Sequence, residues 1–217
     1  MKTALIDLHY LPSIEYFCAL LPFEKIILEK HEHYIKQSYH NRCYILGANK
    51  IERLVVPLKS RDGKTSISAI EIDHQQKWLN LHWRSIQSAY GRAPYFIFYA
   101  EMFEAIFRKE HRLLYDLNLE LLTLCLKIIG LNKDITESTS YQNKTDEHIA
   151  LLRNQISPKR NWQERGFYKP KPYIQVFGNK FVPNLSILDL IFCEGKHAVK
   201  VLQQSAGNLN IINFQGV

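Results

Sequence analysis

The segment 4-ALIDLHYLPSIEYFCALLPFEKIILE-29 decides the fold. Residues 4–9 are typical of a short strand, and Pro12 is well placed to open a helix over 13–21. Residues 25–29 form a second apolar run of strand length. Because a strand, a helix and a second strand in this order are typical of a parallel pair, we expect the chain to begin with a β-α-β unit.

The region that follows predicts further strands. Residues 43–58 look like a β-hairpin whose turn is 47-GANK-50, and 67-ISAIEI-72 resembles another strand. Together with the β-α-β unit, these strands predict a small mixed sheet in the N-terminal part of the chain.

After residue 75 the hydrophobic period changes from that of strands to that of helices. The pattern predicts helices over 75–90, 94–109, 112–129, 185–195 and 196–204. The 112–129 helix is apolar nearly all round, so we expect it in the centre of the fold or in a dimer interface. A short strand is expected at 173–177. The predicted fold class is therefore α/β, with a largely helical C-terminal half.

The length of 217 residues is suited to a single domain over 1–217. Asp7 and His9 interrupt the first apolar run too early for a secretory signal peptide. The longest apolar run, 113–131, contains three charged residues and an asparagine, whereas a membrane span needs roughly 20 mostly apolar residues. Four cysteines without a CxxC pair are typical of free thiols in a reducing compartment. These features predict a cytoplasmic protein without a membrane span.

The positive charge of the chain is concentrated in residues 151–180. The formal net charge is +7, and this segment contains seven basic residues against one acidic residue. A local basic segment predicts an anionic partner, such as a phosphate, a nucleotide or RNA, although a solvated basic loop would look the same. Four aromatic residues are interleaved with the basic ones, namely Trp162, Phe167, Tyr168 and Tyr173. Residues 132–147 are polar and predict a mobile loop.

No strong catalytic signature is present in the sequence. It contains no GxGxxG, Walker loop, GxSxG or HExxH pattern. His31 and His33 would lie on one face of an extended segment and could ligate a metal, but two ligands do not make a site. We therefore predict no metal ion and no cofactor.

The segment 36-KQSYHNRCYI-45 mixes polar and apolar residues in a way that neither a solvated loop nor a core strand requires. Arg42 could hold a phosphate or a carboxylate with two parallel hydrogen bonds, and Asn41 could add a donor and an acceptor. The alternative is that Arg42 pairs with a carboxylate at the edge of the core, such as Asp73 or Asp189.

A second group of candidates surrounds the predicted helix break 91-GRAP-94. His82 lies on an apolar helix face, where a lone histidine is usually a core residue but could also be a general acid or base. Because open α/β sheets bind ligands outside the carboxyl ends of their strands, we predict one pocket for a phosphorylated or carboxylated ligand. His82 is its catalytic candidate, and its binding candidates are Lys36, Gln37, Asn41, Arg42, Arg84, Tyr90 and Tyr95.

Several segments, taken together and in this order, are similar to a known family. They are 10-YLPSIEYF-17, 32-EHYIKQSYHNRCYI-45, 54-LVVPL-58, 78-WLNLHWRSIQSAYGRAPYF-96, 173-YIQVF-177 and 183-PNLSILDLIFCEG-195. They resemble the WbqC-like protein family, in its Bacteroidetes-type branch, over nearly the whole chain. The family's N-terminal pattern is similar to HQPNYLPWLGYF, from which this chain departs at Ile6, Asp7 and His9. His40 stands where the family often has arginine.

The resemblance implies a cytoplasmic transferase in the biosynthesis of O-antigen or a related surface polysaccharide. It would move an acyl-type group onto a nucleotide-activated amino sugar, a small anionic substrate whose phosphates Arg42 and Arg84 would hold. Two other hypotheses remain open. The chain could be a non-enzymatic protein that binds RNA or another anion through 151–180, or a structural scaffold that forms a homodimer through the 112–129 helix.

Overall fold

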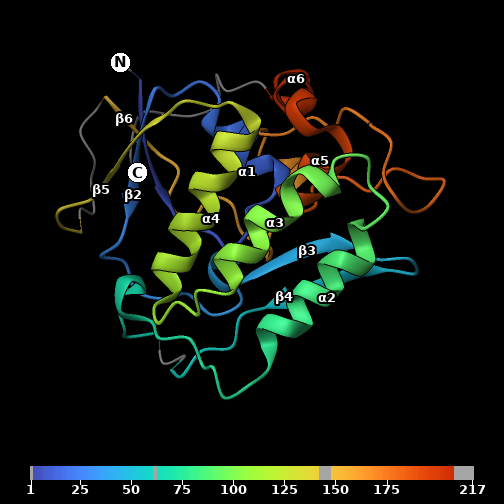
Figure 1. Ribbon diagram of the computed structural model, residues 1–217. Helices are drawn as coiled ribbons and strands as arrows, with labels where there is room; N and C mark the ends of the chain where they lie inside the picture. Colours follow the sequence, from blue (N-terminus) through green and yellow to red (C-terminus); the bar gives the residue numbers. More distant parts are fainter. Residues whose placement is uncertain (1, 61–62, 142–147, 208–217) are drawn as a thin grey trace.

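A four-stranded parallel sheet forms one side of the molecule, on the left in Figure 1. The structure is a computed structural model that describes residues 2–60, 63–141 and 148–207. The sheet order is β5-β2-β1-β6, and its strands are β1 (Thr3–Asp7), β2 (Lys25–Glu29), β5 (Asp134–Glu137) and β6 (Ile149–Leu151). Strands β1 and β2 pair in parallel from Thr3↔Lys25 to Asp7↔Glu29, which confirms the predicted β-α-β unit.

Helix α1 (Ile14–Leu20) connects the two central strands and lies in the core. All seven of its residues are buried, because the sequence 14-IEYFCAL-20 is apolar on every side except at Glu15. One face of the sheet is buried with it, through Ala4 and Ile6 on β1 and Ile26 and Leu28 on β2. Because successive side chains of a strand point to opposite faces, these four residues lie on the same face of the sheet; on β1 the opposite face is buried too, at Leu5.

A separate two-stranded hairpin contains β3 (Arg42–Leu46) and β4 (Ile51–Val55). The strands are antiparallel, from Arg42↔Val55 to Leu46↔Ile51, and the backbone N–H of Gly47 donates to the carbonyl of Lys50 at 3.0 Å. The predicted hairpin and its turn are therefore confirmed. Figure 1 shows the hairpin at the lower right beside α2.

The remaining helices follow the predicted pattern. They are α2 (Trp78–Tyr90), α3 (Phe96–Phe107), α4 (Leu114–Ile129), α5 (Ile187–Glu194) and α6 (Ala198–Ser205). Short 3-10 turns also occur at η1 (Tyr39–Asn41), η2 (Ile67–Ala69), η3 (Trp162–Glu164) and η4 (Gly195–His197). Helix α4 ends at Gly130, which adopts the left-handed conformation with φ 75°. None of the helices in the described ranges has both the length and the apolar character that a membrane crossing requires.

Helix α4 is a central helix of the single chain. Ten of its sixteen residues are buried, and it packs against α3, α5 and the turn η2. The first of the two alternatives for the 112–129 helix, a place in the centre of the fold, is therefore confirmed. Its apolar character requires no second subunit, and a homodimer stays a prediction.

Three local predictions are wrong. Residues 67–72 form the turn η2 followed by isolated bridges, because Ile67, Ile70 and Ile72 are buried without strict alternation. The predicted 132–147 loop contains strand β5, a polar edge strand that the alternation of apolar residues could not reveal; residues 142–147 lie outside the described part. Residues 173–177 form no strand, and the Gln175 amide pairs instead with the backbone of Val182 in both directions.

Candidate functional site

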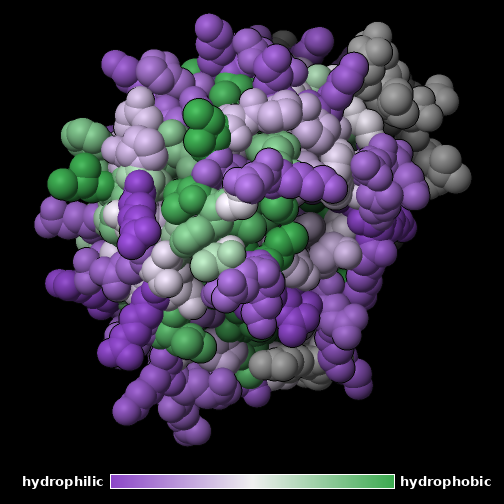
Figure 2. Space-filling view, turned by 90° about the vertical axis from the view of Figure 1, so that its right-hand side faces the viewer, coloured by the Kyte–Doolittle hydropathy of each residue, from purple (hydrophilic) through white to green (hydrophobic). Residues whose placement is uncertain are grey.

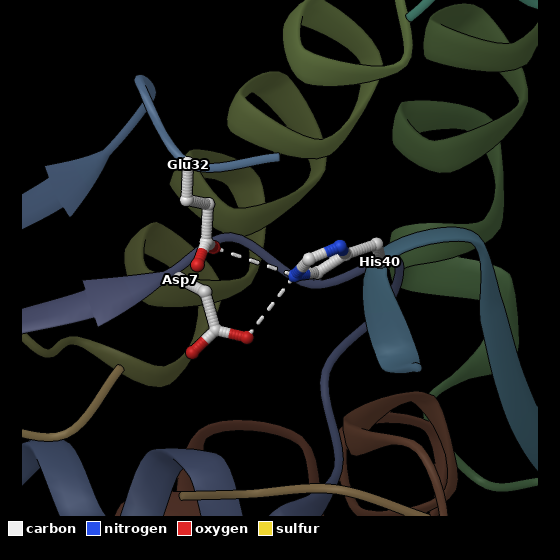
Figure 3. A group of neighbouring side chains, drawn as sticks. All are labelled: Asp7, Glu32 and His40. Carbon is white, nitrogen blue, oxygen red and sulfur yellow. Dashed lines mark hydrogen bonds and ion pairs between the residues drawn. The ribbon is translucent and has the colours of Figure 1, made fainter. Parts of the chain in front are cut away.

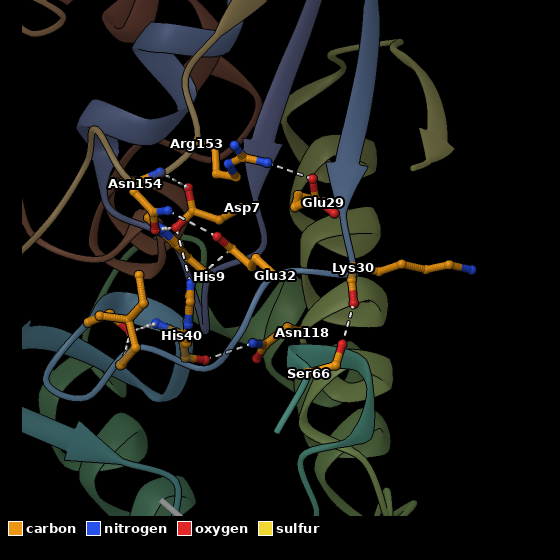
Figure 4. A network of polar contacts seen from close by, with 12 residues as sticks. Asp7, His9, Glu29, Lys30, Glu32, His40, Ser66, Asn118, Arg153 and Asn154 are labelled. Carbon is orange, nitrogen blue, oxygen red and sulfur yellow. Dashed lines mark hydrogen bonds and ion pairs between the residues drawn. The ribbon is translucent and has the colours of Figure 1, made fainter. Parts of the chain in front are cut away.

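The carboxyl ends of the four parallel strands carry a group of polar side chains, of which Asp7, Glu29 and Ser138 are buried and Asn154 is exposed. Asp7 and Glu29 are the last residues of β1 and β2, Ser138 follows β5, and Arg153 and Asn154 follow β6 closely. The exposed fractions of Asp7, Glu29 and Ser138 are 2%, 0% and 9%. Figure 4 shows Arg153 beside Glu29 and Asn154 beside Asp7 at this edge of the sheet. Ligand sites in open α/β sheets are typically found at this edge.

Asp7 is the centre of this group. Its Oδ2 atom accepts hydrogen bonds from Nε2 of His9 at 2.7 Å and from Nε2 of His40 at 3.2 Å. Its Oδ1 atom accepts a hydrogen bond from the backbone N–H of Asn154 at 2.9 Å. The carboxylate of Asp7 therefore joins the end of β1 to the segments that contain His40 and Asn154.

Local structure fixes the position of His40. The hydroxyl of Ser38 accepts the backbone N–H of His40 at the start of η1. The side-chain amide of Asn118, on α4, donates to the carbonyl oxygen of His40 at 2.8 Å. The backbone N–H and the backbone carbonyl of His40 thus each have a side-chain partner. These two contacts fix the point from which the imidazole extends.

Glu32 completes the environment of His40 (Figure 3). Its Oε2 atom accepts a hydrogen bond from Nδ2 of Asn154 at 3.0 Å. Its Oε1 atom lies 3.5 Å from Nε2 of His40 and accepts no hydrogen bond within the described part of the chain. Glu32 is only 4% exposed. A buried carboxylate oxygen with this little support is rare in folded proteins.

Glu29 makes a separate and well-satisfied ion pair. Its Oε2 atom accepts Nη1 of Arg153 at 2.9 Å, and its Oε1 atom accepts the hydroxyl of Ser138 at 2.7 Å and the backbone N–H of His31 at 2.9 Å. Each oxygen of this carboxylate therefore has a donor. The pair joins the ends of β2, β5 and β6.

The charges in the group determine its protonation. Burial alone would raise the pKa of the Asp7 carboxyl, but the His9 and His40 imidazoles outweigh burial and hold that pKa well below its usual range. Burial would lower the pKa of His40, but its contacts with Asp7 and Glu32 outweigh burial and raise that pKa to about 9. At neutral pH a cationic imidazole therefore lies beside the carboxylates of Asp7 and Glu32.

His82, the predicted catalytic residue, lies elsewhere. It is 2% exposed, and its Nδ1 atom accepts the hydroxyl of Tyr10 at 2.8 Å. Burial lowers the pKa of His82 to about 4, and the backbone of Val55 offsets part of that effect. This is the geometry of a neutral core histidine, which was the alternative interpretation; a role in proton transfer stays a prediction.

Asn41 and Tyr90 are fully enclosed in the core. The Asn41 amide donates to the carbonyl oxygen of Val56 at 2.8 Å and accepts the hydroxyl of Tyr34 at 3.1 Å. Tyr90 is 0% exposed, and its hydroxyl accepts the backbone N–H of Leu46. The polar atoms of these two residues thus have partners inside the fold, and their predicted contact with a ligand stays a prediction.

The other binding candidates are more accessible. Lys36 and Gln37 are exposed, and Tyr95 is half-buried. Arg42 is half-buried at the start of β3, and its Nε atom has no hydrogen-bond partner in the described structure. The expected alternative partner Asp189 instead accepts hydrogen bonds from the side chains of Tyr173 and Gln175.

An open groove lies between β4 and α2. Its volume is about 1260 Å³, and its lining includes His82 and Arg84 but none of the six other candidates. Basic residues dominate the charge of the lining: Lys50, Arg53, Lys77 and Arg84 against Glu52. The buried ring of Trp78 forms part of the wall. The structure therefore brings two of the eight predicted residues into one groove.

The comparison with known sequences assigns the chain to a family. The profile of the WbqC-like protein family matches residues 8–166 and 159–201. The chain belongs to this family. It is also similar to the uncharacterized protein Rv1507c of Mycobacterium tuberculosis, with 24% identity over 93% of this chain and 97% of that protein. No solved structure matches.

The basic segment of this WbqC-like protein, residues 151–180, is partly used inside the fold. Arg165 holds the fully buried carboxylate of Glu15 with two hydrogen bonds of 2.7 and 2.6 Å, and Arg153 pairs with Glu29. Phe167 and Tyr168 are buried. The five other basic residues are exposed: Lys159, Arg160, Lys169, Lys171 and Lys180. RNA binding through this segment stays a prediction, and it now rests on these five exposed basic residues and not on all seven.

The surface of the WbqC-like protein also exposes large apolar side chains. Ile97 and Phe98, both on α3, are 82% and 67% exposed. On the face shown in Figure 2, apolar atoms gather near the centre and hydrophilic side chains surround them. Other exposed apolar side chains of the described residues include Ile51 on β4, Leu81 on α2 and Ile174, and no large exposed apolar side chain of the described residues lies on α4.

Sequence analysis of the WbqC-like protein missed the buried group at the ends of the strands. Asp7 and His9 were interpreted as interruptions of an apolar run and as departures from the family pattern, and no role was predicted for Glu32. A signal was present, because Asp7 and Glu29 lie at or near the carboxyl ends of two predicted parallel strands.

Proposed function

We propose that this WbqC-like protein is a transferase that moves an acyl-type group onto a nucleotide-activated amino sugar of a surface polysaccharide. The observation that carries the proposal is the charge of the β4–α2 groove, whose lining has four basic side chains and one acidic side chain. A nucleotide sugar carries its negative charge on a diphosphate. A concave surface with an excess of positive charge attracts such a ligand and raises its local concentration.

The arrangement of the groove also supports the proposal. Arg53 comes from β4 and Arg84 from α2, so the two guanidinium groups belong to opposite walls. Guanidinium groups bind phosphate oxygens through pairs of parallel hydrogen bonds. The half-buried aromatic side chain of Tyr44 in the same lining offers apolar surface to a nucleobase.

The proposed reaction forms an amide. The amine of the sugar attacks the acyl carbonyl carbon, a C–N bond forms, the bond to the leaving group breaks, and the amine proton passes to the leaving group. His82 is the imidazole in the groove lining and is the candidate base. It is neutral at pH 7, but its pKa of about 4 lies below the operating pH near which a general base is most effective. Tyr10 would have to release Nδ1 for His82 to take that role.

Thermal unfolding with a panel of nucleotide sugars tests the proposal. At roughly 100 times its dissociation constant, one nucleotide sugar should raise the melting temperature by about 5–10 °C. Arg53→Ala and Arg84→Ala should each weaken its binding about 10-fold or more, because each removes a charge-assisted contact. Arg160→Ala, an exposed arginine outside the groove, is the matched control and should bind normally.

A second candidate function is the binding of an anionic polymer through the five exposed basic residues between 159 and 180. It predicts a shift with RNA that disappears at high salt and is unchanged in Arg84→Ala. If only this shift were observed, the transferase proposal would be wrong. If no nucleotide sugar and no RNA bound, the scaffold hypothesis would be favoured over both.

A further inference from the structure

Three buried side chains bring metal-ligating atoms together at the edge of the sheet. Asp7, Glu32 and His40 each direct one such atom into a common space, and these atoms all lie within 4.8 Å of one another. Figure 3 shows the three side chains pointing toward one another from the end of β1, the segment after β2 and the turn before β3. The exposed fractions of the residues are 2%, 4% and 0%.

The separations between these atoms suit an ion better than they suit direct hydrogen bonds. Nε2 of His40 lies 3.2 Å from Oδ2 of Asp7 and 3.5 Å from Oε1 of Glu32. Hydrogen bonds between an imidazolium and a carboxylate are shorter, about 2.7–2.9 Å. Ligand atoms at about 2.1 Å from a tetrahedral zinc ion lie about 3.4 Å from one another. The two separations from Nε2 of His40 are therefore compatible with ligands around an ion, and all three ligand atoms lie within 4.8 Å of one another.

Asn154 holds both carboxylates in the orientation that an ion requires. Its backbone N–H donates to Oδ1 of Asp7 at 2.9 Å, and its side-chain amide donates to Oε2 of Glu32 at 3.0 Å. The other oxygen of each carboxylate is left facing His40. Residues that fix the non-ligating oxygens of metal ligands are typical of metal sites. Asn154 makes both contacts from a left-handed backbone conformation, with φ 61°.

The charge of the cluster also favours a cation. Two buried carboxylates that face one imidazole supply the negative charge that a divalent cation needs. Oε1 of Glu32 accepts no hydrogen bond from a described residue, and its contact with Nε2 of His40 is 3.5 Å long. A divalent cation bound by both carboxylates and a neutral His40 imidazole would give this oxygen a close partner.

We propose that Oδ2 of Asp7, Oε1 of Glu32 and Nε2 of His40 bind one divalent transition-metal ion of the zinc type. Mixed imidazole and carboxylate ligands suit such ions better than Mg²⁺ or Ca²⁺. His9, whose Nε2 atom lies 2.7 Å from the same Asp7 oxygen, orients that carboxylate from outside the triad. The ion would link the end of β1 to the segment after β2, which contains Glu32, and to the turn before β3, which contains His40. This proposal does not depend on the transferase proposal.

Metal binding by the full-length protein tests this inference. The purified protein is treated with a chelator, dialysed and titrated with Zn²⁺, and in parallel with Mn²⁺. One ion of Zn²⁺ per chain should remain after gel filtration, and the melting temperature should rise by about 5–10 °C at roughly 100 times the dissociation constant. X-ray absorption of the zinc-loaded protein should show only light ligands, nitrogen and oxygen, at about 2.0–2.2 Å.

Substitutions then locate the ion. Glu32→Gln keeps the shape of the side chain and its contact with Asn154, and it should weaken zinc binding at least 10-fold; His40→Gln should do the same. His33→Gln, on the exposed residue next to Glu32, is the matched control and should bind normally. Binding of much less than one zinc ion per chain, or equal binding by Glu32→Gln and the parent, would overturn the proposal. If a variant failed to fold, sulfur ligands in the spectrum of the parent protein would overturn it equally.

Discussion

Nε2 of His40 lies 3.2 Å from Oδ2 of Asp7, although the two residues are 33 positions apart in the chain. Asp7 ends a strand of the parallel sheet, and His40 lies in the turn before the first strand of the hairpin. This buried contact joins two sheets that share no ladder of backbone hydrogen bonds. The stability of the whole fold should therefore depend on the protonation of one imidazole.

The first prediction concerns that dependence in the presence of a chelator. The folded-state pKa of His40 is raised from 6.5 to about 9, so its stabilising contribution is complete below pH 6.5 and is lost as the pH rises through 9. The free energy of unfolding should fall by on the order of 3 kcal/mol over this range. Urea unfolding at pH 6, 7.5 and 9 measures it. His40→Gln should remove this part of the decline, and equal slopes in the two proteins would contradict the prediction.

The second prediction concerns His82, whose pKa burial lowers to about 4. Its ring should stay neutral at pH 5.5, where an ordinary histidine is mostly charged. Because the unfolded chain binds this proton and the folded chain does not, His82 should reduce stability as the pH falls from 6.5 to 4. Nitrogen-detected NMR of the imidazole rings reports the titration directly. A midpoint near 6.5 for His82 would show that its burial is not maintained in solution.

The third prediction concerns Arg165 and the fully buried carboxylate of Glu15. Arg165→Ala should destabilise the protein by about 3–5 kcal/mol, because it leaves a buried charge without its partner. Arg160→Ala should change stability by less than about 0.5 kcal/mol, because that side chain is exposed. Thermal and urea unfolding of both variants measure the difference. A similar small effect for both would mean that water reaches Glu15.

The fourth prediction concerns Gly130 at the end of α4. No atom lies within 4 Å of a Cβ built at this position, so Gly130→Ala should be penalised only for the left-handed backbone, by about 1–2 kcal/mol. Gly130→Asn should lose less, because asparagine tolerates this conformation better. Comparison of their melting temperatures tests the order. If alanine were as stable as glycine, the helix end would have rearranged.

The sequence predicted the elements whose signal is local. The β-α-β unit, the hairpin and the five helices are specified by periodicity, turn residues and helix ends within each segment. Strand β5 was missed because it is a polar edge strand, and its partner β2 lies more than a hundred residues away. The Asp7–His40 contact was missed for the same reason. The hydrophobic period of a sequence does not show which buried charged residues will contact one another, since tertiary packing determines these pairs.

The pairing of the sheet has a consequence for the order in which the protein can fold during synthesis. Strands β1 and β2 lie within the first 29 residues, whereas β5 and β6 begin at residues 134 and 149. While the chain is being made, Glu29 lacks Arg153, and Asp7 lacks the backbone N–H of Asn154, until these residues have left the ribosome. The contacts at this edge of the sheet can be completed only when at least 154 of the 217 residues exist. Pairing over such long sequence separations is slow. The outer edges of β1 and β2 should therefore stay unpaired, and accessible to chaperones, until β6 and β5 have been synthesised.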